Sequence, residues 1–537
     1  MIDRHNGQDS IAHNHVIRLK LIFLFWIVLA LLACDKKEGQ TNSPKGITSS
    51  ELWVDETETY LPITAEWTNR VEVADINGDD RVDLIFANGG NYSAPGTPEF
   101  SRIFINQGPE KKFKEITTQV FSEQKYLSRV IKVCDVNEDG IPDIIVGTTY
   151  QTQSQLYMGL GAGKFKNVTA TQFPKMNASV GDLELGDVDA DGDLDMVLSD
   201  WGIGSNMNNT GGRTLLWLND GDGNFTDVTK TQMPELLIQF SWDVEFFDFD
   251  NDFDLDIAIS CKRCGTSRIF VNDGVGNFED KRLLPAYTNN YDFEIMDVNN
   301  DGFLDLITIN DGEIVLGASD SRREHIFLNQ NGETFIDATD MLWPDSENIG
   351  KDDNNIVFLD YDSDGDPDFL ISSLTGEDRL LENNGAGNFK LLQPVLKGKP
   401  TPLTLSMALG DINNDKKLDI IMGQGEGKDG IEERIFIAKN SAPDTAPPII
   451  SHYQITENKD TGTTTIKARI HDNKSPNMPQ DWRSVLVIVG EMAVSTSMIW
   501  YGENLWQASF PTTLEKNLVT ICATDRSENK KCIVVSK

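Results

Sequence analysis

The chain has 537 residues, of which 39% are hydrophobic; this content supports buried cores and excludes a disordered acidic chain. Its 85 Asp and Glu exceed 47 Lys and Arg, so the formal net charge is −38. A charge of this size repels DNA, RNA and anionic lipid, which argues against nucleic-acid binding. The acidic residues are concentrated in short repeated loops, which indicates bound cations.

The N-terminus is typical of an export signal and is left out of the fold. Arg18 and Lys20 precede an uninterrupted apolar run at residues 21–32, which is too short for an ordinary transmembrane helix. The run ends at Ala33-Cys34, and small and apolar residues directly before a Cys resemble the bacterial lipobox. In that motif the Cys is lipidated and the peptide before it is removed.

We therefore predict a signal peptide at residues 1–33, a lipid on Cys34 and a flexible polar tether at residues 34–50. The protein is expected to be exported and membrane-anchored, either in the periplasm or at the cell surface. An uncleaved anchor helix is the alternative interpretation.

One nine-residue pattern recurs seven times, with Asp at positions 1, 5 and 9 of every copy and Asp or Asn at position 3. Together with the backbone carbonyl of position 7, these side chains can surround Ca²⁺, which accepts six to eight oxygens in loose geometry. The sequence thus predicts up to seven Ca²⁺ loops with ligands at Asp75, Asn77, Asp79, Arg81 and Asp83; Asp135, Asn137, Asp139, Ile141 and Asp143; Asp187, Asp189, Asp191, Asp193 and Asp195; Asp248, Asp250, Asp252, Asp254 and Asp256; Asp297, Asn299, Asp301, Phe303 and Asp305; Asp360, Asp362, Asp364, Asp366 and Asp368; and Asp411, Asn413, Asp415, Lys417 and Asp419. We number them loop 1 to loop 7.

Gly at position 6 permits the positive φ of a sharp turn. Three loops have other residues there, namely Asp80, Phe253 and Lys416. Loop 4, with Phe253, keeps five carboxylates and is expected to bind at some cost in strain. Loop 7 has two Lys beside three Asp, so its calcium site is doubtful.

An EF-hand begins with a similar pattern but needs an acidic residue at position 12 and helices on both sides. Here the flanks are short, apolar and β-branched, as in strands. Each loop is therefore expected to be the turn of a β-hairpin. Position 12 is never acidic and is occupied by Phe86, Val146, Leu198, Ile259, Thr308, Ile371 and Met422.

A second hairpin follows each loop, for example RIFVNDGVGNF at 268–278, and two hairpins make the four strands of one propeller blade. These residues resemble the FG-GAP (VCBS-type) repeat of integrin α-chain propellers and many bacterial surface proteins. The predicted fold is thus all-β, with a seven-bladed β-propeller at residues 51–441. The seventh repeat stops after RIFIAKN at 434–440, so strand 53–57 is expected to complete that blade and close the ring.

After the Pro-rich linker at residues 442–448 the repeats end. Residues 449–537 alternate apolar and polar residues in short runs separated by turn residues. This pattern predicts a small β-sandwich, and the stretch resembles bacterial Ig-like modules.

The remaining cysteines suit an oxidising compartment. We predict disulfides between Cys261 and Cys264 and between Cys522 and Cys532, with free thiols as the alternative for the second pair. Cys134 lies in an apolar strand and is predicted to be a buried, inert thiol. A zinc site would need a second ligand pair at matching spacing, and a thioredoxin-like site would need a βαβ unit; the sequence has neither.

The sequence favours binding over catalysis, because it contains no nucleophile-elbow, zincin or phosphate-loop motif and its acidic clusters repeat seven times. The long connections between strands 2 and 3 and between blades share the face opposite the metal loops. We expect recognition of a glycan or protein there, while a polysaccharide lyase and a structural envelope subunit are the alternatives. The candidate ligand-binding aromatics are Tyr92, Tyr150, Trp201, Tyr287, Tyr291 and Trp343.

Overall fold

The computed structural model describes residues 51–91, 94–204, 208–287, 290–310, 323–401, 403–425, 432–489, 494–511 and 519–535. The predicted signal peptide, Cys34, the tether up to residue 50 and Tyr92 lie outside these residues. The chain divides into a unit at Met1–Lys45 and a unit at Gly46–Lys537, and all elements below belong to the second. None of the helices in the described ranges has the length and apolar character needed to cross a membrane.

The first six repeats each form one four-stranded antiparallel sheet with its strands in chain order. The repeats therefore fold as predicted, with a metal loop joining strands 1 and 2 of each sheet. The sheets are β2 (Thr68–Ala74), β3 (Asp83–Asn88), β4 (Arg102–Ile105) and β5 (Lys114–Glu115); β6 (Ser128–Cys134), β7 (Asp143–Thr148), β8 (Gln155–Gly159) and β9 (Phe165–Asn167); β10 (Val180–Gly186), β11 (Asp195–Asp200), β12 (Thr214–Leu218) and β13 (Thr226–Asp227); β14 (Val244–Phe247), β15 (Asp256–Ile259), β16 (Arg268–Asn272) and β17 (Phe278–Asp280); β18 (Asn290–Met296), β19 (Asp305–Asn310), β20 (His325–Asn329) and β21 (Phe335–Asp337); and β22 (Asp353–Leu359), β23 (Asp368–Ser373), β24 (Arg379–Asn383) and β25 (Phe389–Leu392).

The seventh sheet combines both ends of the repeat region. Strand β1 (Trp53–Asp55) pairs antiparallel with β29, placing Trp53 opposite Ala438. It also pairs in parallel with β26, a fifth strand that the sequence pattern does not reveal. The sheet order is β26-β1-β29-β28-β27, with β26 at Leu396–Lys397, β27 at Thr404–Gly410, β28 at Asp419–Gln424 and β29 at Arg434–Ala438.

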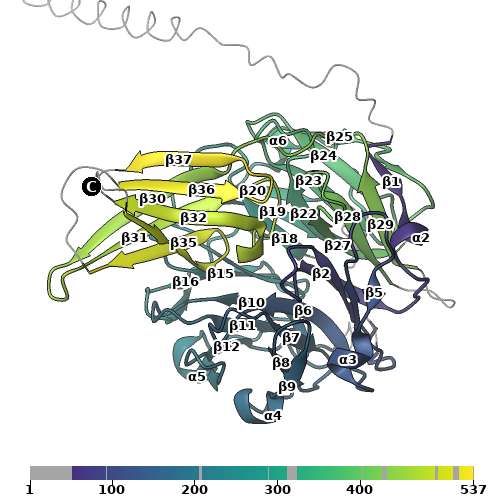
Figure 1. Ribbon diagram of the computed structural model, residues 1–537, viewed down its shortest axis with the longest axis horizontal. Helices are drawn as coiled ribbons and strands as arrows, with labels where there is room; N and C mark the ends of the chain where they lie inside the picture. Colours follow the sequence, from purple (N-terminus) through teal and green to yellow (C-terminus); the bar gives the residue numbers. More distant parts are fainter. Residues whose placement is uncertain are drawn as a thin grey trace, which may run out of the picture. The chain divides into compact units, whose positions relative to one another are not determined.

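The seven sheets close into a ring, which makes the fold a seven-bladed β-propeller (Figure 1). The first strands of the blades contact one another in turn, from β2 through β6, β10, β14, β18 and β22 to β27, and β27 contacts β2 again. Apolar residues of neighbouring blades share cores; Ile85 of blade 1, for example, belongs to one cluster with Ile144 of blade 2. In the seventh blade, the pairing of β1 with β29 covers a strand edge that would otherwise be open to aggregation.

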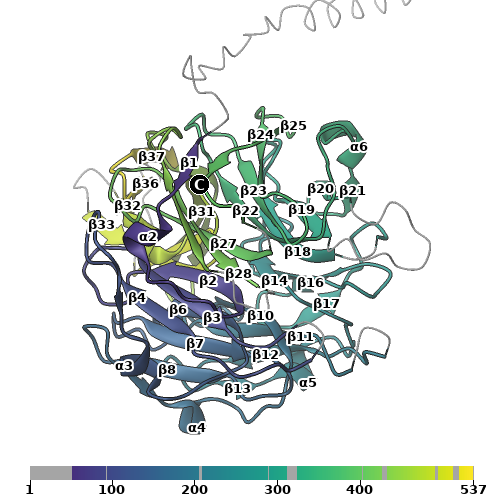
Figure 2. The same ribbon diagram turned by 90° about the vertical axis from the view of Figure 1, so that its right-hand side faces the viewer.

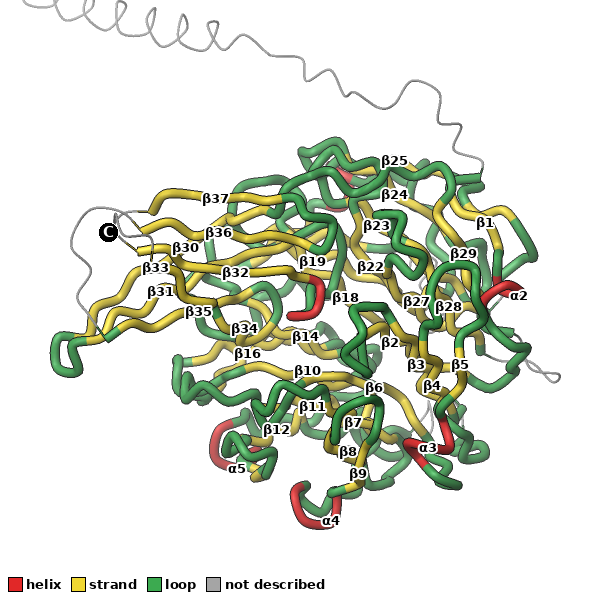
Figure 3. The backbone as a smooth tube through the Cα atoms, viewed as in Figure 1, coloured by secondary structure: helices red, strands yellow, loops and turns green. Residues whose placement is uncertain are grey.

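Short helical turns follow the outer strands of five blades (Figure 3). Each begins with a Thr whose hydroxyl accepts a hydrogen bond from the backbone of strand 3, as when Leu216 N–H donates to Thr229 Oγ1 at 3.0 Å. Sequence periodicity cannot reveal helices of four or five residues. The turns are α2 (Thr57–Tyr60), α3 (Thr117–Phe121), α4 (Thr169–Gln172), α5 (Thr229–Gln232) and α6 (Thr339–Leu342).

The C-terminal residues form two four-stranded antiparallel sheets, β30-β31-β35-β34 and β33-β32-β36-β37 (Figure 2). Buried residues of both sheets, including Ile466 and Ile521, share one core, so the sheets make a sandwich. The strand order is that of the ABED and CFG sheets of immunoglobulin domains, with one further strand beside C. The strands are β30 (Ile449–Asn458), β31 (Thr463–His471), β32 (Trp482–Val489), β33 (Val494–Ser497), β34 (Ile499–Gly502), β35 (Leu505–Phe510), β36 (Val519–Asp525) and β37 (Lys530–Val535), with a 3₁₀ turn η1 (Pro479–Asp481) before β32.

Both predicted disulfides are present. Cys261 is bonded to Cys264 in the connection after β15. Cys522 and Cys532 face each other across β36 and β37 and are bonded. Cys134 is a free, buried thiol whose pKa burial raises to about 12, so it is inert as predicted.

Candidate metal centres

The last Asp of each loop is buried and accepts backbone hydrogen bonds, in addition to being a candidate metal ligand. In loop 3, Val188 N–H donates to Asp195 Oδ2 at 3.1 Å and Asn219 N–H donates to Asp195 Oδ1 at 2.9 Å. The same two backbone donors, one from position 2 and one from the end of strand 3, recur in the other six loops. The ninth residue therefore ties the hairpin turn to strand 3 of its own blade.

The first and fifth residues coil the loop through hydrogen bonds to its own backbone. In loop 6, Asp364 and Gly365 donate their N–H groups to the two oxygens of Asp360, at 3.1 and 2.9 Å. Asp366 N–H then donates to Asp364 Oδ1 at 3.0 Å. The loop is thus pre-formed around its acidic side chains, which lowers the entropy lost when an ion binds.

Two residues of every loop have a left-handed backbone. At position 6 the three replacements for Gly also adopt positive φ, with values of 66° at Asp80, 70° at Phe253 and 65° at Lys416. Position 4 is left-handed too, a feature that the sequence hides because Gly78 is the one glycine among these residues. The others are Glu138, Ala190, Asn251, Asn300, Ser363 and Asn414, with φ between 55° and 64°.

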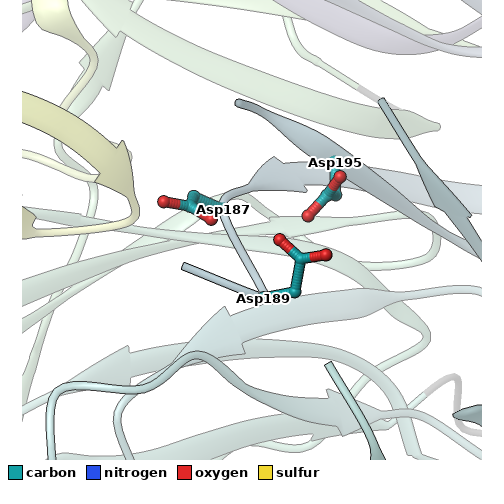
Figure 4. Close-up of side chains that lie close together, drawn as sticks. All are labelled: Asp187, Asp189 and Asp195. Atoms are coloured by element: carbon teal, nitrogen blue, oxygen red, sulfur yellow. The ribbon is translucent and has the colours of Figure 1, made fainter. Parts of the chain in front are cut away.

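Loops 3, 4 and 6, which have Asp at position 3, bring three carboxylates together. One oxygen of each lies within 4.8 Å of the others in the groups Asp187–Asp189–Asp195, Asp248–Asp250–Asp256 and Asp360–Asp362–Asp368. In loop 3, Asp189 and Asp195 turn their carboxylates toward each other, with Asp187 beside them (Figure 4). These groups can hold a metal ion.

Unpartnered oxygens in these groups support a cation. Buried carboxylate oxygens without a hydrogen-bond donor are costly, because burial removes the water that would solvate them. Positions 1 and 3 account for all the cases in these loops, and a bound cation would satisfy each of them. They are Oδ1 of Asp187, Asp189, Asp248, Asp250 and Asp362.

Burial shifts the acidity of the same groups. Desolvation raises the pKa of Asp195 to about 8 and that of Asp360 to about 7. In loop 3, burial and then the charges of Asp191 and Asp189 raise the pKa of Asp187 to about 6. The native fold thus disfavours these anions unless a proton or a cation compensates them.

The loops with Asn at position 3 differ in their internal partners. In loop 1, Arg81 forms an ion pair with Asp79, and Asn77 Nδ2 donates to Asp83 Oδ2 at 3.1 Å. In loop 7 the two Lys point to other partners, since Lys416 donates to Ser527 O at 2.6 Å and Lys417 donates to Lys439 O at 2.9 Å. In loop 1 the Arg81 side chain therefore supplies a positive charge to the loop carboxylates. In loop 7 the two lysine side chains bond to carbonyl groups outside the loop.

In five blades an Asn at the end of strand 3 links the blade to the metal loop of the preceding blade, a contact that the loop pattern does not predict. Asn219 Nδ2 of blade 3 donates to Val136 O at position 2 of loop 2, at 2.8 Å. Equivalent bonds join Asn106, Asn272, Asn329 and Asn383 to the loop of the preceding blade. The signal in the sequence is the Asn that recurs at this position in five blades, whereas blades 2 and 7 have Gly159 and Ala438.

The C-terminal sandwich contacts six of the seven metal loops. Lys467 and Arg469 of β31 both donate to loop 4, at Phe253 O and Asp248 Oδ2. The sandwich therefore covers the metal-loop face of the propeller. The contacts, one for each loop, are Asp80 with Arg526, Asp187 with Tyr501, Asp248 with Arg469, Gly302 with Arg469, Asp360 with Asn473 and Lys416 with Ser527.

A cavity of about 110 Å³ lies between the inner strands and the sandwich. Arg70 Nη2 donates there to carboxylates from three blades, at 3.0, 3.2 and 2.9 Å for Asp182, Asp243 and Asp292. Lys474 and Glu503 of the sandwich also line the cavity. The sandwich thus closes this end of the propeller channel.

The prediction that aromatic side chains on this face are exposed to a ligand is wrong for three of them. Trp201, Tyr291 and Trp343 are buried, with exposed fractions of 2%, 4% and 2%, and Tyr150 and Tyr287 are half-buried. Trp201 packs with Phe240, Trp242, Tyr291 and Tyr150 in an aromatic cluster, and Trp343 packs between blades 5 and 6. Trp201, Tyr291 and Trp343 are therefore core residues that are not exposed to a ligand, whereas ligand binding by Tyr150 and Tyr287 stays a prediction.

The fold and the loops define a β-propeller of repeated blades with acidic, metal-capable hairpin turns. The chain matches the family model described as the FG-GAP-like repeat at residues 75–146, 135–198, 203–259 and 360–422. FG-GAP-like repeats are typical of extracellular proteins, and they suggest a ligand-binding or adhesion type of propeller domain. None of the curated proteins compared with the chain matches it.

Proposed function

We propose that the chain is an exported, lipid-anchored, Ca²⁺-binding propeller that recognises a glycan or a protein outside the cytoplasm. The observation that carries the proposal is the position of the sandwich. Because it contacts six metal loops, the face formed by the long connections is the one available to a ligand. Bound Ca²⁺ then has a structural role, because it stabilises the loops that contact the sandwich.

Calcium is the cation that best suits the loops. Their side-chain ligands are carboxylates and amides, and hard oxygen donors select Ca²⁺ or Mg²⁺ over softer metals. Loops of nine residues that differ in sequence supply irregular geometry, which Ca²⁺ tolerates and Mg²⁺ does not.

The ligand surface that we propose lies on the connections of blade 3. Ile203, between β11 and β12, and Leu237, between β13 and β14, each have an exposed fraction of 57%. A β-bridge between Gly212 and Ile238 joins these two connections. The aromatic cluster around Trp201 packs beneath them, so the surface is rigid and loses little entropy on binding.

The test is an array of glycans and envelope proteins probed with the full chain in Ca²⁺. We expect a hit that the double variant Ile203→Asp/Leu237→Asp abolishes. The matched control is Leu160→Asp, because Leu160 is 59% exposed but lies in the turn between β8 and β9, on the metal-loop side.

Two results would contradict the proposal. One is an array that stays blank while the protein is folded. The other is release of unsaturated sugars absorbing in the ultraviolet from a polysaccharide, because that product shows a lyase. Binding that survives the double variant would place the ligand on another surface.

A further inference from the structure

Three carboxylates outside the seven loops meet where the linker joins the sandwich to the propeller. Asp444 lies in the linker, Asp472 follows β31, and Asp525 is the last residue of β36. One oxygen of each lies within 4.8 Å of the other two. No sequence motif connects these residues, because they come from segments far apart in the chain.

Two of the three carboxylates are buried and incompletely hydrogen-bonded. Asp525 is 1% exposed; its Oδ1 accepts a hydrogen bond from Asn529 N–H at 2.8 Å, but its Oδ2 has no partner. Asp444 is 9% exposed, and its Oδ1 has no partner either. Two orphaned anionic oxygens beside a third carboxylate are strongly unfavourable without a compensating cation.

The basic side chains nearby are engaged elsewhere. Lys416 donates to Ser527 O at 2.6 Å, Arg526 donates to Asp80 Oδ1 at 2.5 Å, and Lys474 donates to Asp481 Oδ2 at 2.9 Å. Within the described ranges, no Lys, Arg or His forms an ion pair with the three carboxylates. The charge of Lys416 acts on Asp444 and Asp525 from a distance, but no ion pair neutralises the cluster within the described ranges.

The site is accessible to an ion with part of its hydration shell. A cavity of about 140 Å³ is lined by Asp444 and Asp472, together with Asn473 and Ser527. This volume holds several waters, which would complete the coordination that three carboxylates begin.

We propose that Asp444, Asp472 and Asp525 bind a divalent cation, Ca²⁺ or Mg²⁺, that fixes the linker and the β36–β37 hairpin against loop 7. Hydrogen bonds already bring these segments together: Asp444 N–H donates to Lys416 O at 2.6 Å, and Asn529 Nδ2 donates to Asp444 O at 3.3 Å. The ion joins the sandwich to the propeller at the point where the chain crosses between them. This site rests on its own residues and is independent of the ligand recognition proposed above.

The experiment compares the full chain with Asp472→Asn, in chelator and in Ca²⁺ or Mg²⁺ alone. Without metal, the substitution removes like-charge repulsion and should raise the melting temperature. With metal, it removes a ligand and should lower the melting temperature, and the number of ions bound per chain should fall by one. Asp481→Asn is the matched control, because Asp481 is a sandwich carboxylate paired with Lys474 and should leave the ion count unchanged.

The proposal is overturned if Asp472→Asn raises the melting temperature equally in both conditions and the ion count stays the same. That result would mean that a proton, not a metal, compensates the cluster. If Asp472→Asn fails to fold, Asp444→Asn gives the same comparison from the linker side. If either variant loses one ion but still binds its ligand on the array, the cation site is separate from the ligand-binding surface on the long connections.

Discussion

Arg469 of the sandwich donates a hydrogen bond of 2.9 Å to Oδ2 of Asp248, the first residue of loop 4. Both residues are 1% exposed, and Asp248, which belongs to the carboxylate group of the loop, keeps its Oδ1 without a hydrogen-bond donor. One Asp thus serves a candidate metal site with one oxygen and the sandwich interface with the other. Metal binding and docking of the sandwich are therefore expected to be coupled.

Replacing Arg469 should reveal this coupling. Arg469→Met leaves Asp248 buried without its cation, which typically costs about 3–5 kcal/mol of unfolding free energy. The loss should be larger in chelator than in Ca²⁺, because the ion replaces part of the missing charge. Urea unfolding with and without Ca²⁺ measures both values. The control is Lys467→Met, which removes a longer ion pair of 3.6 Å with Asp254 and should lower the unfolding free energy less. If Arg469→Met loses the same unfolding free energy in chelator and in Ca²⁺, the coupling is contradicted.

Calcium should weaken the fall of stability with rising pH. Burial raises the pKa of Asp195, Asp305 and Asp419 to about 8, far above the ordinary 3.8. In chelator the native state holds protons that the unfolded state releases, so stability should fall as pH rises from about 4 to about 8, by about 1.4 kcal/mol per group and pH unit, and should level off above pH 8. In Ca²⁺, protons compete with the ion, so calcium affinity should fall as pH falls.

Thermal melts across this range in both media test the signs. At saturating Ca²⁺ the ligands stay ionised, and the decline of stability up to pH 8 should be smaller than in chelator. A melting temperature that rises steadily with pH in chelator would contradict the assignment of these buried groups.

Closure of the ring depends on Trp53. Its side chain is fully buried, and its Nε1 donates to Leu418 O at 2.8 Å. Trp53→Ala should cost about 3–5 kcal/mol, and deletion of residues 51–58 should cost at least as much because it leaves the edge of β29 open. Ile63→Ala, at a side chain that is 77% exposed, should change the melting temperature little. A truncated protein that melts with the parent would disprove closure by this strand.

Trp201 should behave as a core residue. It is buried, donates through Nε1 to Thr149 Oγ1 at 2.8 Å and stacks on Phe240 at 5.7 Å between ring centroids. Trp201→Ala should therefore lower stability by about 3–5 kcal/mol. Guanidinium unfolding of the variant measures this. A stable variant that has lost only ligand binding would instead support a direct contact with the ligand.

The local features of this fold could be predicted from the sequence. The nine-residue loops and the paired hairpins determine the number of blades, and the truncated seventh repeat predicts that β1 completes the last one. Both disulfides follow from the positions of their cysteines. These inferences need only spacing and short-range pairing.

The remaining features depend on contacts between distant segments. Trp201 is buried by residues from three other segments of the chain, and the docking of Arg469 on Asp248 joins residues 221 positions apart. The cluster of Asp444, Asp472 and Asp525 has no repeat to reveal it. Left-handed backbone at Glu138 or Ala190 is also hidden, because most residues at position 4 are not glycine.

The most direct test of the account is the number of Ca²⁺ ions bound by the chelator-treated full chain, measured by equilibrium dialysis. We predict at least three ions, from loops 3, 4 and 6, and the loss of one ion in each of the variants Asp187→Asn and Asp360→Asn. The melting temperature should also rise with Ca²⁺, because each site stabilises the folded state by about 2.7 kcal/mol at a hundredfold excess of Ca²⁺ over Kd. A folded chain that binds no Ca²⁺ and melts at the same temperature in chelator would contradict it.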